Sequence, residues 1–411
     1  MATVHPADFG IGRREFVGLV AAIMAVNALG IDLMLPALPT IGRELGVASA
    51  NSRQWVVTAY MFGFGVGQLV YGPLADRFGR KIILLGTLLG FVAASVLAAH
   101  AQTFTLLLAA RVLQGTMSAS TRVLASAIVR DRYAGRQMAR TLSMAQMIFF
   151  LVPILAPSIG QLLLGLGHWR IIFYALGLFA AGVFGWALTR LPETLAVHHR
   201  IPISFKTLGV AYRLTLTNRY SIGYAVAGAL SFGGVIAFVS SSQQIFVDLF
   251  HAGHRFAILF AICAFFMGCA SFANSHLVVR VGTRVLSQTG ICALIVLSLV
   301  HIATIALGLE NVWTFISFQS LSMTCIGLCG SNFGAMAMDP VGHIAGTASS
   351  IQGTVTNIGA VGVGTLIGQS FNGTTFPLAI GNLGIGVAIL GVVYVVEGGR
   401  LFHAHMESPA A

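Results

Sequence analysis

The chain has 411 residues, of which 56% are hydrophobic and only 9% are charged. Because a soluble domain carries about 25% charged residues, this composition excludes an ordinary soluble globular protein. Many hydrophobic runs reach about 20 residues, long enough to cross a hydrocarbon core about 30 Å thick. The net charge of +11 is compatible with nucleic-acid binding, but the positions of the charges indicate membrane topology instead.

Twelve hydrophobic stretches are predicted to form membrane-spanning helices. In chain order they cover residues 16–38, 54–74, 82–100, 104–126, 141–166, 169–190, 220–247, 256–278, 286–307, 311–336, 345–371 and 375–396. The one long polar connection, residues 191–219, separates six stretches from six. We therefore expect an all-α membrane protein with an N-terminal six-helix bundle in residues 1–190, a linker, and a C-terminal six-helix bundle in residues 220–411.

The basic residues indicate how these helices cross the membrane. If the N-terminus is inside, most of the 23 Lys and Arg residues fall in inner connections, and few fall in outer ones. Basic residues in short connections favour the cytoplasmic side. We expect both termini and the 191–219 linker to be cytoplasmic, with a lipid bilayer and no nucleic acid among the partners.

Enzymatic and metal chemistry find little support in the sequence. The five cysteines all lie in hydrophobic stretches of the second half and lack metal-ligand spacing. The histidines lie largely in connections and at helix ends. With no nucleophile–base pair or phosphate loop in view, we expect no metal, no cofactor and no enzymatic activity. The second half also shows no clear buried charge.

Asp32, Arg111 and Arg122 stand inside hydrophobic stretches of the first half, and we expect Arg122, close to the inner surface, to extend its side chain to the interface. Asp32 lies far from either end of the first stretch, and Arg111 lies about seven residues into the fourth. A charge at that depth costs roughly 2.5–3.5 kcal/mol on insertion scales, and such residues mark ion or proton pathways. At 1.5 Å per residue, Asp32 and Arg111 lie within about one helical turn of the same depth. This placement allows a shared polar network that couples protons to another process; the alternative is that Arg111 is a structural arginine bonded to backbone carbonyls.

The connection after the second stretch carries a dense motif, Gly72-Pro73-Leu74-Ala75-Asp76-Arg77-Phe78-Gly79-Arg80-Lys81. It resembles the signature loop of the major facilitator superfamily, whose fold is two six-helix bundles. Glycines permit a tight turn and close helix approach, and Arg80 is placed to pair with Asp131. We expect a conformational switch at the cytoplasmic helix ends, formed by residues Gly72, Asp76, Arg77, Gly79, Arg80 and Asp131.

Three further motifs extend the resemblance. The motif at Arg111 is similar to one of the superfamily, and the other two resemble drug:proton antiporters, especially the bicyclomycin and chloramphenicol resistance branch. The first stretch ends with Asp32, Pro36 and Pro39 in the spacing of that branch, and Arg111 begins an Arg-x-x-Gln-Gly motif. The fifth stretch resembles the antiporter motif through the Pro157 bend and Gly160, although Ala156 and Gln161 replace glycines. This resemblance implies a protein of the bacterial cytoplasmic membrane.

The resulting functional hypothesis is a proton-coupled exporter of small neutral or monovalent amphipathic drugs, working by alternating access as a monomer. Protons would bind at Asp32, with Arg111 beside it. Residues predicted to line the substrate cavity are Asp32, Tyr60, Gln146, Phe149, Phe238, Gln243 and Asn332. A sugar or amino-acid transporter of the same fold stays open as an alternative. A membrane receptor or integral-membrane enzyme is a third, disfavoured by the signature loop.

Overall fold

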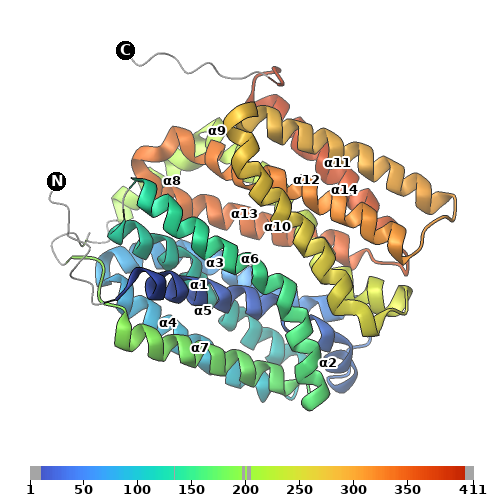
Figure 1. Ribbon diagram of the computed structural model, residues 1–411, viewed down its shortest axis with the longest axis horizontal. Helices are drawn as coiled ribbons and strands as arrows, with labels where there is room; N and C mark the ends of the chain where they lie inside the picture. The colour runs from blue at the N-terminus through green and yellow to red at the C-terminus, as the bar shows by residue number, and fades with distance from the viewer. Residues whose placement is uncertain (1–10, 134, 197–199, 201–204, 403–411) are drawn as a thin grey trace. The chain divides into compact units, whose positions relative to one another are not determined.

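The computed structural model consists of helices and connecting turns (Figure 1). It describes residues 11–133, 135–196, 200 and 205–402, with side chains at all of these except 135, 136, 139, 143, 146–150, 205–208, 343 and 345. Within that part of the chain no strand occurs. The prediction of an all-α membrane fold is confirmed.

The chain divides into two compact units, Met1–Val210 and Ala211–Ala411. Long helices of the first unit are α1 (Arg13–Asp32), α3 (Trp55–Phe78), α4 (Arg80–Ala99), α5 (Phe104–Arg132), α6 (Gly135–Leu166) and α7 (Arg170–Arg190). Those of the second are α9 (Arg219–Gln243), α10 (Phe256–Val281), α11 (Thr283–Ala306), α12 (Val312–Met338), α13 (Ala345–Gln369) and α14 (Phe376–Val396). The helix α8 (Phe205–Thr217), which the sequence analysis did not predict, lies in the polar connection.

Eight helical stretches of the described chain are long and apolar enough to cross a membrane. The helices α3, α5 and α13 are not among them, because glycine and polar residues interrupt them, and the Leu151–Leu166 part of α6 counts as a shorter apolar helix. These four helices are 24 to 32 residues long, which exceeds the roughly 20 residues needed to span the hydrocarbon core. Twelve membrane crossings therefore stay a prediction.

The first predicted helix ends earlier than expected. The helix α1 stops at Asp32, and a 3-10 turn (Leu35–Ala37) and the short helix α2 (Leu38–Glu44) follow. Pro36 and Pro39 lack backbone N–H groups and cannot continue the α-helical hydrogen-bond ladder. Asp32 therefore sits at a break in the helix.

The two units share one packing pattern. In the first, the neighbouring pairs are α3 with α5, α4 with α7, α4 with α5, and α1 with α6. In the second, the corresponding pairs are α10 with α12, α11 with α14, α11 with α12, and α9 with α13 (Figure 1). The turns that join α3 to α4 and α10 to α11 also match, since Gly79 and Gly282 both have positive φ, at 105° and 87°. This repetition fits two parallel structural repeats.

Close contact between α3 and α5 positions the residues discussed next. A Cβ atom added at Gly63 or Gly115 would collide with the backbone carbonyl of Val112 or Tyr60, respectively. Glycine at both positions therefore allows the two helix backbones to touch. Small residues at such interfaces are typical of helix packing in membranes.

Candidate functional site

Arg111 lies entirely inside the first unit. Its side chain is fully buried, and its guanidinium donates from Nε to the Val56 carbonyl at 3.1 Å and from Nη2 to the Gly30 carbonyl at 2.8 Å. A third bond joins Nη1 to Oε1 of Gln114 at 2.5 Å. The planar fork of Arg111 thus ties α5 to α1 and α3, instead of facing lipid.

A polar network extends from this arginine through four helices. Gln114 donates from Nε2 to Ser95 Oγ at 2.7 Å, which reaches α4. The Tyr60 ring lies under the guanidinium, with 4.3 Å between the ring centroid and Cζ. The Tyr60 hydroxyl donates to Ser118 at 2.7 Å and to Asn27 Oδ1 at 3.2 Å. A cation over an aromatic face is stabilised when both are shielded from water.

Asp32 lies at the edge of this network, two residues beyond the Gly30 carbonyl that Arg111 binds. The Asp32 residue is 5% exposed, and no hydrogen bond or ion pair to its carboxylate is found among the described residues. Arg111 therefore contacts the backbone beside Asp32 without forming an ion pair with it. Burial disfavours the charged form of any carboxylate, so access to water or to a bound molecule would change its proton occupancy.

The helix α6 closes the other side of Asp32. A Cβ atom added at Gly160 would collide with the carbonyl oxygen of Leu33 and approach Pro36 Cγ at 3.4 Å. The absence of a side chain at Gly160 therefore lets α6 lie directly on the break after α1. Pro157 lies one turn earlier in the same helix, where a missing N–H weakens the backbone ladder.

Substituting Gly160 with alanine is expected to impair both stability and transport. The added methyl group must push α6 away from Leu33, and such overpacking costs about 1–3 kcal/mol. Thermal melting in detergent and an uptake or efflux assay measure the two effects. Gly165→Ala is the matched control, because a Cβ atom at Gly165 in the same helix has nothing within 4 Å. Equal behaviour of the two variants would contradict a role for close packing at Gly160.

The residues of the signature loop meet at the other end of the first unit. Arg80 is 7% exposed; its Nη1 lies 2.6 Å from Asp76 Oδ1, and its Nε lies 3.2 Å from Asp131 Oδ2. The structure therefore brings Asp76, Arg80 and Asp131 together. Arg77 instead lies against the Phe78 ring, 5.3 Å from its centroid, and Gly72 lies inside α3.

Glu193 joins this cluster although the sequence analysis did not single it out. Its carboxylate accepts hydrogen bonds from the backbone N–H groups of Arg80 at 2.8 Å and Lys81 at 3.2 Å. Backbone N–H groups in the first turn of a helix have no acceptor within the helix, and the helix dipole stabilises negative charge there. Glu193 supplies both the acceptor and the charge. A side chain at Gly79 would occupy the space of this carboxylate. The sequence feature that could have predicted this role is the position of Glu193, an acidic residue shortly after the sixth predicted helix.

The predicted cavity residues of the second half have internal partners. Phe238 is 2% exposed and stacks on Phe260 with 5.6 Å between ring centroids. Asn332 donates to Asn274 Oδ1 at 2.9 Å, and Gln243 Nε2 lies 3.5 Å from Asp248. Tyr60 in the first unit is likewise enclosed in its network. The side chains of Gln146 and Phe149 lie outside the described residues.

Comparison with known proteins identifies the family. The model of the Major Facilitator Superfamily matches residues 20–364. The chain belongs to the major facilitator superfamily. It is therefore a multi-pass membrane transporter and not an enzyme, as the sequence predicted.

Relatives within the superfamily carry names that refer to drug resistance. The chain is 29% identical over 368 residues to the bicyclomycin resistance protein homolog of Haemophilus influenzae, covering 88% of this chain and 91% of that protein. It is 29% identical to multidrug resistance protein D of Escherichia coli, covering 92% and 93%. It is 28% identical to a chloramphenicol resistance protein of Pseudomonas aeruginosa, covering 93% and 91%.

Solved structures show the same fold at low sequence identity. The crystal structure of a D-xylose-proton symporter matches with a TM-score of 0.71 and 14% identity, covering 94% of this chain and 98% of that one. The human organic anion transporter MFSD10 matches with a TM-score of 0.64 and 16% identity, covering 94% and 100%. At these identities the likeness concerns the fold alone.

Proposed function

We propose that this transporter is a drug:proton antiporter of the bacterial cytoplasmic membrane, with both termini in the cytoplasm. The observation that carries the proposal is the buried Asp32 carboxylate, which lies at a helix break beside a polar network and lacks an ion-pair partner among the described residues. Relatives named for bicyclomycin and chloramphenicol resistance support small amphipathic drugs as the substrate class. A single acid at this depth favours neutral or monovalent compounds.

In this proposal Asp32 exchanges a proton for substrate. Arg111 cannot shed its own proton to escape burial, and three of its five N–H donors bind two carbonyl oxygens and Gln114. It therefore keeps the end of α1 in place without neutralising Asp32. The carboxylate can therefore bind a proton in one state and release it when substrate binds.

Transport by reconstituted protein tests the proposal. Proteoliposomes containing the full chain and radiolabelled chloramphenicol should move the drug against its gradient when a proton gradient is imposed. Addition of drug to purified protein in weak buffer should release protons. Movement of a sugar or an amino acid with protons, together with no movement of drug, would replace this function by the alternative metabolite transporter.

We also propose that the cluster of Asp76, Arg80, Asp131 and Glu193 is the conformational switch. It joins the ends of α3, α4 and α5 to the segment after α7 through one buried arginine and two capping bonds. Such charged contacts can be made in one state and released in another.

Asp76→Asn is expected to change the ratio of inward-open to outward-open molecules about threefold, since a partly exposed ion pair is worth up to about 1 kcal/mol. Distances between spin labels, one on each unit, report this ratio. Glu15→Gln is the control, because it breaks the 2.7 Å ion pair with Arg190 outside the cluster. Unchanged distance distributions in Asp76→Asn, with and without drug, would argue against a switch.

A further inference from the structure

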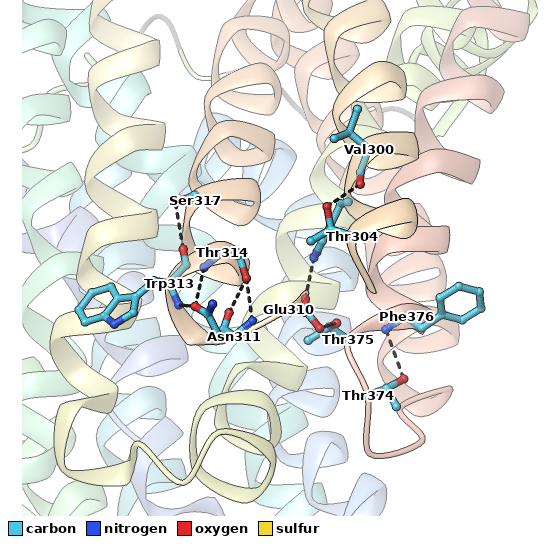
Figure 2. Close-up of polar contacts among 11 residues, drawn as sticks. Val300, Thr304, Glu310, Asn311, Trp313, Thr314, Ser317, Thr374, Thr375 and Phe376 are labelled. Atoms are coloured by element: carbon cyan, nitrogen blue, oxygen red, sulfur yellow. Dashed lines mark hydrogen bonds and ion pairs between the residues drawn. The ribbon is translucent and has the colours of Figure 1, made fainter. Parts of the chain in front are cut away.

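A buried histidine and a glutamate form a pair in the second unit, where the sequence analysis expected no clear buried charge. His301 on α11 is 3% exposed, and its Nε2 lies 2.8 Å from Glu310 Oε1. The other carboxylate oxygen of Glu310 accepts a hydrogen bond from the Thr375 hydroxyl at 2.5 Å (Figure 2). The imidazole is thus buried, the carboxylate is 13% exposed, and both groups are bonded.

Backbone hydrogen bonds and helix caps position Glu310 between α11, α12 and α14. The turn after α11 closes with a bond from Leu309 N to the Thr304 carbonyl, and Gly308 supplies a positive φ of 69°. Directly after Glu310, Asn311 caps α12 through a reciprocal capping box with Thr314. Thr375 is the residue that precedes α14 and is fully buried. Figure 2 shows Glu310 between the α12 cap and Thr375.

Two aromatic rings and one carboxylate surround the imidazole of His301. The ring stacks on Phe318 with 4.7 Å between centroids and an interplanar angle of 13°, and Phe315 lies 6.1 Å away. Aromatic faces attract cations, and a hydrogen bond between ionised partners is about twice as strong as a neutral one. Histidine changes charge between about pH 5 and 8, so this contact is sensitive to acidity.

Other titratable groups on the elements around His301 do not bond to it in the described chain. Cys263 on α10 receives a hydrogen bond from Ser320, and Arg284 pairs with Glu397 at 2.8 Å. Arg284 is 17 residues from His301 along α11, roughly 25 Å at 1.5 Å per residue. The remaining such groups on α10, α11, α12 and α14 are Cys269, His276, Arg280, Cys292, Cys325, Cys329 and Tyr394. None of these has a hydrogen bond or ion pair with His301 or Glu310 in the described chain.

We propose that His301 and Glu310 form a second proton-binding site, separate from Asp32, that holds the α11–α12 turn against α11 when His301 is protonated, while Glu310 links the same turn to Thr375 at the start of α14. Loss of that proton leaves a neutral imidazole beside the Glu310 carboxylate, and the bond between them becomes weaker. The second unit then has its own response to pH. This response requires neither the drug nor the proton exchange proposed for Asp32.

Hydrogen–deuterium exchange of the purified full-length protein in detergent tests the proposal. Protection factors of the 307–311 turn should be about tenfold lower at pH 8 than at pH 5.5, the scale of a charge-assisted hydrogen bond. His301→Gln keeps an N–H donor but cannot bind an extra proton, so its protection factors should not depend on pH. Glu310→Gln removes the carboxylate and should behave in the same way.

Two controls separate this site from other sources of pH dependence. His276→Gln removes an exposed histidine of α10 and should leave the pH response of the turn intact. Asp32→Asn should also leave it intact, even if that variant fails to transport. A wild-type turn whose protection is constant or rises with pH would overturn the proposal, as would an unchanged pH response in His301→Gln.

Discussion

Replacing Asp32 with asparagine is expected to abolish proton-driven export while the protein still inserts and folds. Asparagine has nearly the shape of aspartate but cannot take up or release a proton. The carboxylate has no ion pair among the described residues, so its loss leaves no opposite charge unpaired. Removing an unpaired buried charge does not destabilise a fold. Thermal melting of the variant should therefore equal or exceed that of the wild type.

The measurement is drug accumulation in proteoliposomes with an imposed pH gradient, together with drug-induced proton release from purified protein. Both signals should fall to background in Asp32→Asn, whereas Asp32→Glu should retain part of each. Glu15→Gln, which neutralises an acid of the first unit in a partly exposed pair with Arg190, should keep both. Normal export by Asp32→Asn along a pH gradient would show that protons are coupled elsewhere.

Changing Arg111 to lysine should damage the protein nearly as much as changing it to alanine. The guanidinium makes three directed bonds, to Val56, Gly30 and Gln114, and stacks over Tyr60. Lysine keeps the positive charge but loses the planar fork of donors. Buried carbonyl oxygens then lose their partners, which costs about 1–3 kcal/mol for each group left unsatisfied.

We expect the melting temperature in detergent to fall by roughly 5 to 10 °C in both variants, and transport to fall with it. The pH at which drug releases protons should also move in Arg111→Lys, because the end of α1 that carries Asp32 is no longer held at Gly30. Arg170→Lys tests a partly exposed arginine of the same unit that contacts Glu44 at 3.1 Å and should have little effect. Full activity of Arg111→Lys would mean that charge alone matters.

The helices could be predicted from the sequence because hydrophobic runs of suitable length have few other solutions in a membrane. The prediction was least accurate near prolines. The hydrophobic pattern predicts one helix up to Leu38, whereas α1 ends at Asp32 and a short separate helix follows at Pro36 and Pro39. The depth of Arg111 could also be inferred, since a helix rises regularly with each residue.

The partners of the buried polar groups could not be predicted in the same way. Asn27, Ser95 and Ser118 are single small polar residues in three different helices, and their meeting depends on how each helix is rotated about its axis. His301 lies only five residues before the end of α11, which suits a surface position. Its burial results from packing against α12 and from the Glu310 turn, both set by tertiary structure.

The contacts of Arg111 also affect how α5 inserts into the membrane during synthesis. A lone arginine inside a hydrophobic helix resists insertion into lipid, by up to about 2.5–3.5 kcal/mol at the helix centre on biological insertion scales. Its carbonyl acceptors belong to Gly30 in α1 and Val56 in α3, and both helices precede α5 in the chain. Since synthesis runs from the N-terminus, these acceptors leave the ribosome before the arginine does. The order of the helices thus allows Arg111 to enter the bilayer with its partners already available.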